Sequence, residues 1–223
     1  MIEAQGMAPE KVVHIPNGIP APPSSAGELR RADLGIEEED LVIGTVGVLR
    51  SEKAIDALVR VMAGLRSRFP RLHLLIVGSG PERGNIEGLI ENLGLSATVH
   101  LLGYRTDVPD LLRVFDVAVS CSQREGSPIS VLEYMEAGLP VVATRVGGIP
   151  DLVQDRVTGL LVEPGDERAL ADALSELLQD PGRRVEMGHL ARDRRRREFD
   201  IDVTVSRLVR LYEELVAAKV AAP

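Results

Sequence analysis

From Leu41 onward, short apolar runs alternate with longer segments whose apolar residues recur at helical spacing. This pattern is typical of parallel strands joined by crossover helices, because strands buried on both faces consist almost entirely of apolar residues. It predicts a doubly wound α/β fold, in which ligands bind outside the carboxyl ends of the strands. The expected strands are Leu41–Leu49, Leu72–Val77, Val99–Leu102, Val117–Ser120, Val141–Ala143 and Leu160–Val162, with a further candidate at Val12–Ile15.

Helices are expected between these strands and after the last of them. Asp166 is a suitable N-cap and Pro181 a suitable first-turn residue for two of the final three. Pro20–Gly27, rich in proline and serine, is expected to be a loop. The expected helices are Glu52–Arg68, Glu82–Leu93, Val108–Val114, Ile129–Ala137, Pro150–Val153, Asp166–Gln179, Pro181–Arg197 and Asp202–Lys219.

Composition excludes several classes of protein. The 223 residues are 44% hydrophobic and 27% charged, as in an ordinary globular protein. The net charge of −8 disfavours nucleic acid as a partner, because a grip on the phosphate backbone needs clustered Lys and Arg. The one cysteine, Cys121, excludes an internal disulfide and a multi-cysteine zinc site, so a reducing compartment is expected.

The first ten residues, MIEAQGMAPE, have neither the basic start nor the apolar stretch of a signal peptide. No apolar run approaches the roughly 18 residues of a membrane span. We therefore expect a cytoplasmic protein, with peripheral membrane contact left open. The arginines between Arg192 and Arg197 are expected on a solvated helix face rather than in an anion or membrane patch. The histidines show no metal-ligand spacing, and none is expected to be catalytic.

Two glutamates bracket a Gly-Ser-Pro turn that leads into a predicted helix in the segment EGSPISVLE. Pro128 suits the first turn, so the backbone N–H groups of Ile129 and Ser130 point out of the helix N-terminus, which is a ready phosphate site. Glu125 is expected in the loop before the helix, and Glu133 about two turns into it. The two carboxylates then reach different parts of an elongated ligand. As an isolated pair, they are more often solvated surface charges.

The segment GTVGVLRSEK runs from the first sheet strand through a short loop into the next predicted helix. Lys53 is expected near the start of that helix, where the helix dipole disfavours a cation. An anionic ligand facing Lys53 would remove the conflict. The alternative is a surface lysine paired with Glu52 or Asp56.

The segment Gly78-Ser79-Gly80-Pro81 looks like the start of a dinucleotide-binding fingerprint. The third glycine, Gly84, falls one place late for GxGxxG, and no acidic residue closes the following strand. A tight turn is therefore expected there, and a nicotinamide or flavin enzyme is disfavoured.

Together these segments resemble the retaining GT-B glycosyltransferases, in particular the large family four. The resemblance implies a Rossmann-like, C-terminal donor-binding domain over residues 1–199 and a helix over 200–223 that crosses to an N-terminal domain. The matching segments are HIPNGI at 14–19, GTVGVLRSEK at 44–53, LIVGSGP at 75–81, VHLLGYRTDVPDLL at 99–112, EGSPISVLEYMEAGLPVVAT at 125–144, VGGIPDLV at 146–153 and TGLLVEPGD at 158–166.

The resemblance also implies roles for individual residues. Glu125 contacts the donor sugar and is the expected catalytic residue, whereas Glu133 binds the ribose hydroxyls. The N–H groups of Ile129 and Ser130 hold the diphosphate beside Gly126, and Lys53 adds a positive charge. The remaining expected contacts lie against the base or supply a second cation; they are Leu102, Tyr104, Arg105 and Arg50.

One position departs from the family pattern. Many members carry an arginine directly after the glycine of the lysine loop, and this chain has Val48 there. Arg50, in the same loop, is the candidate replacement.

The implied reaction is transfer of a hexosyl unit from a UDP-sugar or GDP-mannose to an acceptor, with retained anomeric configuration. No metal or other cofactor is implied, because cations and helix N–H groups balance the charge of the diphosphate. A sugar-nucleotide epimerase half and a non-catalytic nucleotide-binding module are the alternatives.

The family carries an N-terminal acceptor-binding domain that this chain does not match, so the chain is expected to bind donor without transferring sugar. Its last helix, Asp202–Lys219, is expected to bury a broad apolar face. With its usual partner absent, that helix would repack on its own domain or mediate self-association.

Overall fold

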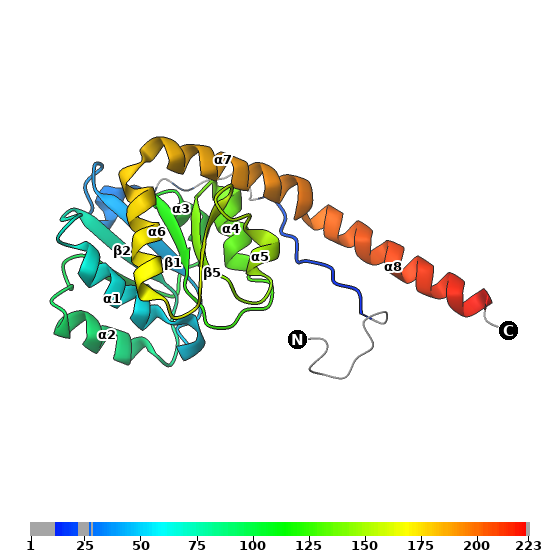
Figure 1. Ribbon diagram of the computed structural model, residues 1–223, viewed down its shortest axis with the longest axis horizontal. Coiled ribbons are helices and arrows are strands. Elements are labelled where there is room, and N and C mark those ends of the chain that lie inside the picture. The colour runs from blue at the N-terminus through cyan, green and yellow to red at the C-terminus, as the bar shows by residue number, and fades with distance from the viewer. Residues whose placement is uncertain (1–11, 22–26, 28, 222–223) are drawn as a thin grey trace.

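The computed structural model describes residues 12–21, 27 and 29–221. Its centre is a six-stranded parallel sheet in the order β3-β2-β1-β4-β5-β6 (Figure 1). The strand order reverses between β1 and β4, which is the mark of a doubly wound, Rossmann-like sheet. The predicted fold class is therefore confirmed. The strands are β1 (Leu41–Val46), β2 (Leu72–Val77), β3 (Val99–Gly103), β4 (Val117–Ser120), β5 (Val141–Thr144) and β6 (Gly159–Val162).

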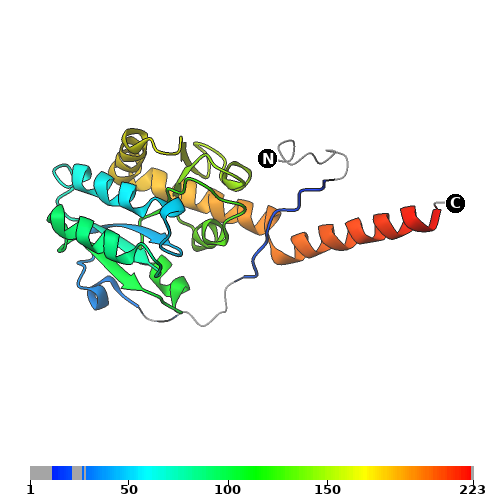
Figure 2. The same cartoon turned by 90° about the horizontal axis from the view of Figure 1, so that it is seen from below.

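Helices cover both faces of the sheet (Figures 1 and 2). One face carries α1 (Ile55–Leu65), α2 (Arg83–Asn92) and α6 (Glu167–Gln179). The other carries α3 (Val108–Leu112), α4 (Ile129–Ala137) and α5 (Ile149–Leu152). Helix α7 (Pro181–Glu198) contacts α6 and β6 and packs along α4, and α8 (Ile201–Ala221) follows it. The described residues also form two short 3-10 helices, η3 (Arg31–Leu34) and η4 (Ser51–Lys53).

The two apolar cores follow from the alternation of side chains along each strand. In β1, Ile43 packs under α1 and α2, whereas Val42 packs toward α3 and α4. In β2, Leu74 and Leu75 divide between the same two cores. Because both faces are covered, nearly every strand residue is apolar, which is why the strands could be recognised in the sequence.

Several predicted boundaries are wrong. β1 ends at Val46 rather than Leu49, because the chain after it turns to pair with the loop after β2. Ala54, with φ +50°, separates η4 from α1, so the helix predicted from Glu52 begins at Ile55. Residues 12–15, which the structure describes, form no strand. Most of the predicted loop 20–27 lies outside the described residues.

The arginine-rich stretch of α7 is only in part the predicted solvated face, because Arg196 and Arg197 are exposed but Arg195 is not. Arg195 is only 1% exposed; its guanidinium lies 3.2 Å from both Glu136 and Asp200 and also donates to the carbonyl oxygen of Ile19. Arg192 donates to two carbonyls at the C-terminal end of α4, at 3.0 and 2.8 Å. The last carbonyls of a helix lack partners within it, and Arg192 supplies donors for two of them.

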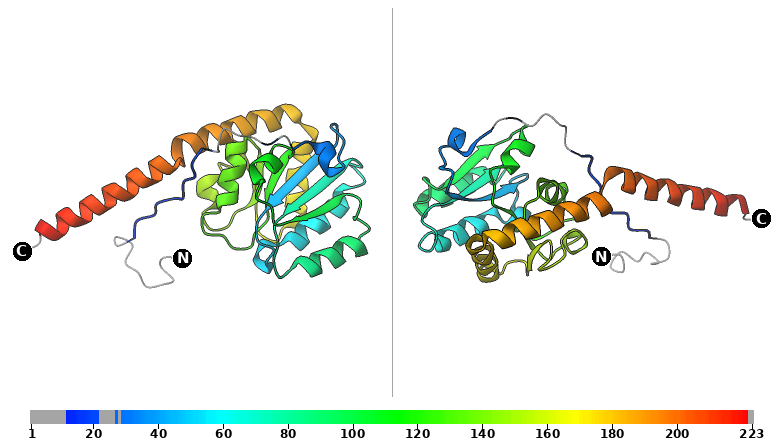
Figure 3. Two further views of the ribbon diagram at one scale, coloured as in Figure 1. Left: turned by 180° about the vertical axis from the view of Figure 1, so that it is seen from behind. Right: turned by 90° about the horizontal axis from the view of Figure 1, so that it is seen from above.

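Helix α8 extends away from the body of the molecule in every view (Figures 1 to 3). The expectation of a buried apolar face is therefore wrong for this structure, and the helix does not repack on its own domain. Six large apolar side chains of α8 are 40–63% exposed: Val205, Leu208, Val209, Tyr212, Leu215 and Val216.

Candidate functional site

The loops after β1 and β2 lie backbone against backbone at the carboxyl edge of the sheet. Leu49 N donates to Ser79 O at 3.0 Å. A Cβ on Gly78, whose φ is +134°, would lie 1.9 Å from Gly47 O, and one on Gly80 would lie 2.4 Å from Leu49 O. Both glycines are thus required by close packing between loops. This packing fixes the loop that leads from β1 to Lys53.

Lys53 and Glu125 meet at this edge, although 72 residues separate them in the sequence. Lys53 Nζ lies 2.5 Å from Glu125 Oε1, and the two side chains are 26% and 10% exposed. Ser122 Oγ donates to the same carboxylate oxygen at 2.6 Å. The alternative in which Lys53 pairs with Glu52 or Asp56 is wrong, because Glu125 takes that place. A cation and a carboxylate from distant segments of the sequence therefore lie in contact at the carboxyl edge of the sheet.

Two further glycines hold the loop that carries Glu125. Gly148 N donates to Gly126 O at 2.7 Å. Gly147 has φ +54°, and a Cβ there would lie 1.8 Å from Glu125 O. The turn after β5 therefore supports the backbone of the Glu125 loop directly. The segment VGGIPDLV carried the signal for this contact, but its role was not predicted.

Helix α4 begins at Ile129 beside the Lys53–Glu125 pair. Its N-cap, Pro128, makes no side-chain capping hydrogen bond. The first N–H groups of a helix have no partner within it, so those of Ile129 and Ser130 are available to a ligand. Ser130 and Lys53 both line one narrow pocket at the carboxyl edge of the sheet. A helix N-terminus and a lysine thus face the same space.

Tyr134 fixes α4 to the end of β1, a contact that the sequence analysis missed. Val46 N donates to Tyr134 Oη at 2.6 Å, and the side chain is fully buried. Burial raises the pKa of the Tyr134 hydroxyl, which keeps it protonated. Tyr134 follows Ser130 by four residues and so lies on the same helix face, which is a signal that could have found it.

Glu133 lies nearer the helix start than predicted. It is the fifth residue of α4, a little over one turn from its beginning rather than about two turns. Burial raises the pKa of the Glu133 carboxyl, and no ion pair to it occurs among the described residues. Burying a carboxylate is costly unless it is hydrogen-bonded, so a ligand that donates hydrogen bonds to Glu133 would offset that cost.

Four expected contacts are not gathered with the others. Leu102 lies next to the end of β3, the edge strand two places from β1, and Tyr104 just after the strand is 80% exposed. Arg105 is paired with Asp107 at 2.5 Å, and this hydrogen bond raises the pKa of Arg105 and lowers that of Asp107. Arg50 is 62% exposed and lies 3.9 Å from Glu52.

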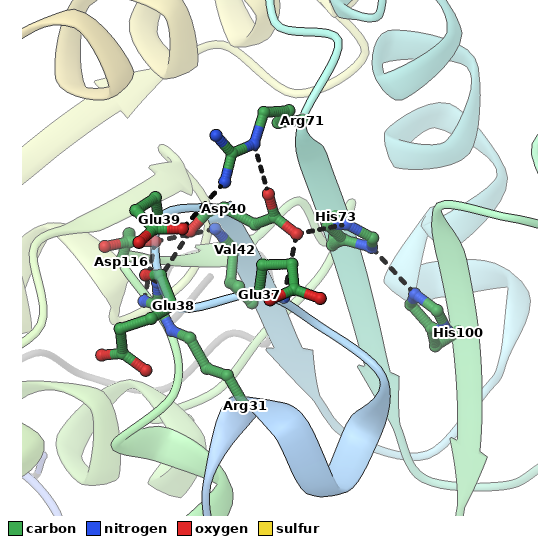
Figure 4. Close-up of polar contacts among 10 residues, drawn as sticks. All are labelled: Arg31, Glu37, Glu38, Glu39, Asp40, Val42, Arg71, His73, His100 and Asp116. Carbon is green, nitrogen blue, oxygen red and sulfur yellow. Dashed lines mark hydrogen bonds and ion pairs between the residues drawn. The ribbon is translucent and has the colours of Figure 1, made fainter.

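A second polar cluster lies at the amino ends of the strands, opposite the carboxyl edge that carries Lys53 and Glu125 (Figure 4). Asp40 Oδ2 lies 3.2 Å from His73 Nε2, and His73 Nδ1 lies 3.0 Å from His100 Nε2. Burial and the neighbouring His73 lower the pKa of His100. Although burial alone would raise the pKa of Asp40, the hydrogen bonds from Arg71 and from Glu37 N lower it. These groups pin the starts of β1, β2 and β3 together.

Two negative findings apply to the described part of the chain. No group of three or more His, Cys, Asp or Glu side chains there is placed to hold a metal ion. None of its helices combines the length and apolar character needed to span a bilayer.

Comparisons with known proteins agree on one family. The family model described as glycosyl transferases group 1 matches residues 27–194. The D-inositol 3-phosphate glycosyltransferase of Salinispora arenicola is 38% identical over 206 residues, which cover 87% of this chain and 46% of that protein. The chain spans about half the length of the curated relatives it matches.

Solved structures show the same likeness. Sucrose-phosphate synthase from Thermosynechococcus elongatus is 31% identical, with a TM-score of 0.79, over 92% of this chain and 52% of that chain. HepE from Anabaena, in complex with UDP, is 26% identical with a TM-score of 0.77, over 82% of this chain and 51% of that chain.

Proposed function

Because the chain belongs to the glycosyl transferases group 1 family, we propose that it is the donor-binding half of a retaining glycosyltransferase. The donor is a UDP-sugar or GDP-mannose, and the group transferred is a hexosyl unit. One observation carries the proposal: the Lys53–Glu125 pair, at 2.5 Å, stands beside the uncapped N-terminus of α4. Family membership favours this function over the sugar-nucleotide epimerase.

The site residues divide the donor between them. The N–H groups of Ile129 and Ser130, with Lys53, hold the diphosphate beside Gly126. Negative charge grows on the departing diphosphate as the bond to the sugar breaks, and these fixed donors stabilise it. In the structure Glu125 is ion-paired with Lys53. It turns toward the sugar hydroxyls when the diphosphate competes for the lysine. No divalent metal is needed in this scheme.

The nucleoside occupies the side of the site nearer β3. Glu133 accepts hydrogen bonds from the ribose hydroxyls, which suits a half-buried carboxylate without an ion pair. The base lies against Leu102, Tyr104 and Arg105. The complex of the Anabaena protein HepE with UDP favours uracil as the first base to test. Arg50 swings toward the diphosphate and replaces the cation absent at Val48.

The acceptor belongs to a second half, since this chain spans about half of its relatives. We place the boundary of the donor domain at residue 199 and assign 200–223 to a helix that crosses to the other half. The exposed apolar residues of α8 fit that role. Alone, the chain binds donor without transferring sugar, and α8 supports self-association. Sedimentation velocity tests the last point: dimers are expected, and a monomer at all concentrations would contradict it.

A titration panel tests the proposed function. Thermal-shift measurements with UDP, GDP, ADP and their sugar conjugates identify the ligand, and calorimetry then gives its stoichiometry. We expect one site for UDP or GDP, with the same affinity in EDTA. Failure of every nucleoside diphosphate to bind, or loss of binding in EDTA, would contradict the proposal.

A further inference from the structure

A short segment far from α4 in the sequence contacts the loop from which α4 begins. We call residues 16–20 the lead-in segment. Within it, the Asn17 side chain donates from Nδ2 to Ser127 O at 2.9 Å, across 110 residues of sequence. Ser127 directly precedes Pro128, the N-cap of α4. The contact therefore falls on the backbone that presents the first N–H groups of the helix.

The lead-in segment is itself fixed to the junction of α7 and α8. Ile19 N donates to Phe199 O, and Ile201 N donates to Ile19 O, each at 3.1 Å. A Cβ on Gly18 would lie 2.5 Å from Thr204 Oγ1, so the lead-in segment and the start of α8 touch without room for a side chain. Asn17 is thus presented to the α4 loop from a defined backbone position.

The other end of α4 is tied to the same segment. Arg195, 1% exposed, donates to the carbonyl oxygens of Ile19 and Pro20. Its guanidinium also lies 3.2 Å from Glu136, close to the C-terminus of α4. The lead-in segment therefore contacts the loop before α4 directly through Asn17, and it is linked to the last turn of α4 through Arg195 and Glu136. A shift of this segment against α4 would be felt at both ends of the helix.

We propose that Asn17 is a positioning residue for the diphosphate. Through the Ser127 carbonyl it sets the loop before α4, and so the direction in which the N–H groups of Ile129 and Ser130 point. The interaction of an anion with a helix N-terminus falls off within one turn, so a small displacement of this loop changes it. The inference rests on the proposed function, because it names a residue that supports the same site from outside.

Calorimetry on the full chain compares Asn17→Ala with Asn92→Ala. Asn92 is exposed at the end of α2, so the second variant makes the same chemical change away from the α4 loop. For Asn17→Ala we expect about 2- to 10-fold weaker binding of UDP or GDP, as for the loss of one neutral hydrogen bond. Uridine and guanosine, which lack the diphosphate, should bind both variants equally. Asn92→Ala should match the parent with every ligand.

Spectroscopy provides a readout without ligand. In Asn17→Ala the amide resonances of Ile129 and Ser130 should shift while the unfolding temperature stays within about 2 °C of the parent, as expected for an exposed contact. Asn17→Asp keeps the size of the side chain and replaces the donor by an acceptor, so it should weaken diphosphate binding further.

Three results are decisive. Parental affinity in both Asn17 variants overturns the positioning role alone, as does an equal loss for nucleoside and nucleoside diphosphate. A parent that binds no nucleoside diphosphate overturns the proposed function, and the positioning role with it.

Discussion

Replacing Lys53 with alanine separates the contribution of its charge from that of the surrounding loop. The lysine Nζ lies 2.5 Å from a carboxylate oxygen of Glu125, and its side chain is 26% exposed. A hydrogen bond to a charged group is worth about 1.5–3 kcal/mol, and each 1.4 kcal/mol is about tenfold in affinity. Lys53→Ala should therefore weaken binding of UDP or GDP about 10- to 100-fold.

The ion pair makes the prediction sharper, because a diphosphate must compete with Glu125 for the lysine. Glu125→Gln removes the competing charge while keeping the size of the side chain. This variant should bind the free nucleoside diphosphate at least as tightly as the parent does. Its affinity for the nucleotide sugar should fall relative to its affinity for the free nucleotide. The two variants should thus move affinity for the free nucleotide in opposite directions.

Isothermal calorimetry at one fixed salt concentration measures both variants. Lys219→Ala, on the exposed surface of α8, is the matched control for removing one positive charge. Parental affinity in Lys53→Ala would refute the reasoning. An equal loss of affinity for the free nucleotide in both variants would do the same.

Three further predictions concern the surroundings of the pair. Gly147→Ala places a Cβ 1.8 Å from Glu125 O at a backbone φ of +54°. Urea unfolding should therefore show a loss of more than about 1 kcal/mol in the free energy of unfolding, and an unchanged unfolding midpoint would contradict the packing argument. Glu133→Ala should weaken UDP and the nucleotide sugar alike by calorimetry, whereas Glu125→Ala should weaken only the sugar conjugate; equal losses in both variants mean that the two roles are misassigned. The pKa of His100 is lowered by burial and by His73, so the unfolded chain binds more protons than the folded chain as the pH falls. The contribution of neutral His100 to the free energy of unfolding is therefore present above about pH 6.5 and is lost as the pH falls below it. Urea unfolding at pH 7.5 and 5.5 should show that His100→Gln loses less unfolding free energy at the lower pH than the parent does. Identical losses would rule out His100 as a cause of the acid sensitivity.

The sheet was largely predictable because its strands are buried on both faces. β2 and β4 begin and end where the apolar runs do. The overlong prediction for β1 has a non-local cause, since Val48 and Leu49 continue the apolar run while their backbone turns toward the loop after β2. Residue propensities also do not predict the break in the helix at Ala54, because non-glycine residues rarely adopt a positive φ.

The candidate site was predictable only in part. The α4 N-terminus follows from Pro128 and the turn before it, which are local signals. The contact between Lys53 and Glu125 joins two loops that only the folded sheet brings together. Arg195 was misjudged because it sits in a run of charges, whereas its burial depends on carbonyls supplied by the lead-in segment. Such partners are fixed by tertiary packing and leave no periodic pattern in the sequence.

A crystal structure of the chain with bound UDP or GDP is the most direct test of the central claim. The account predicts diphosphate oxygens about 3 Å from the backbone nitrogens of Ile129 and Ser130 and from Lys53 Nζ, with the ribose beside Glu133. A nucleotide bound elsewhere, or bound here with Lys53 still held by Glu125 and remote from the phosphates, would contradict it.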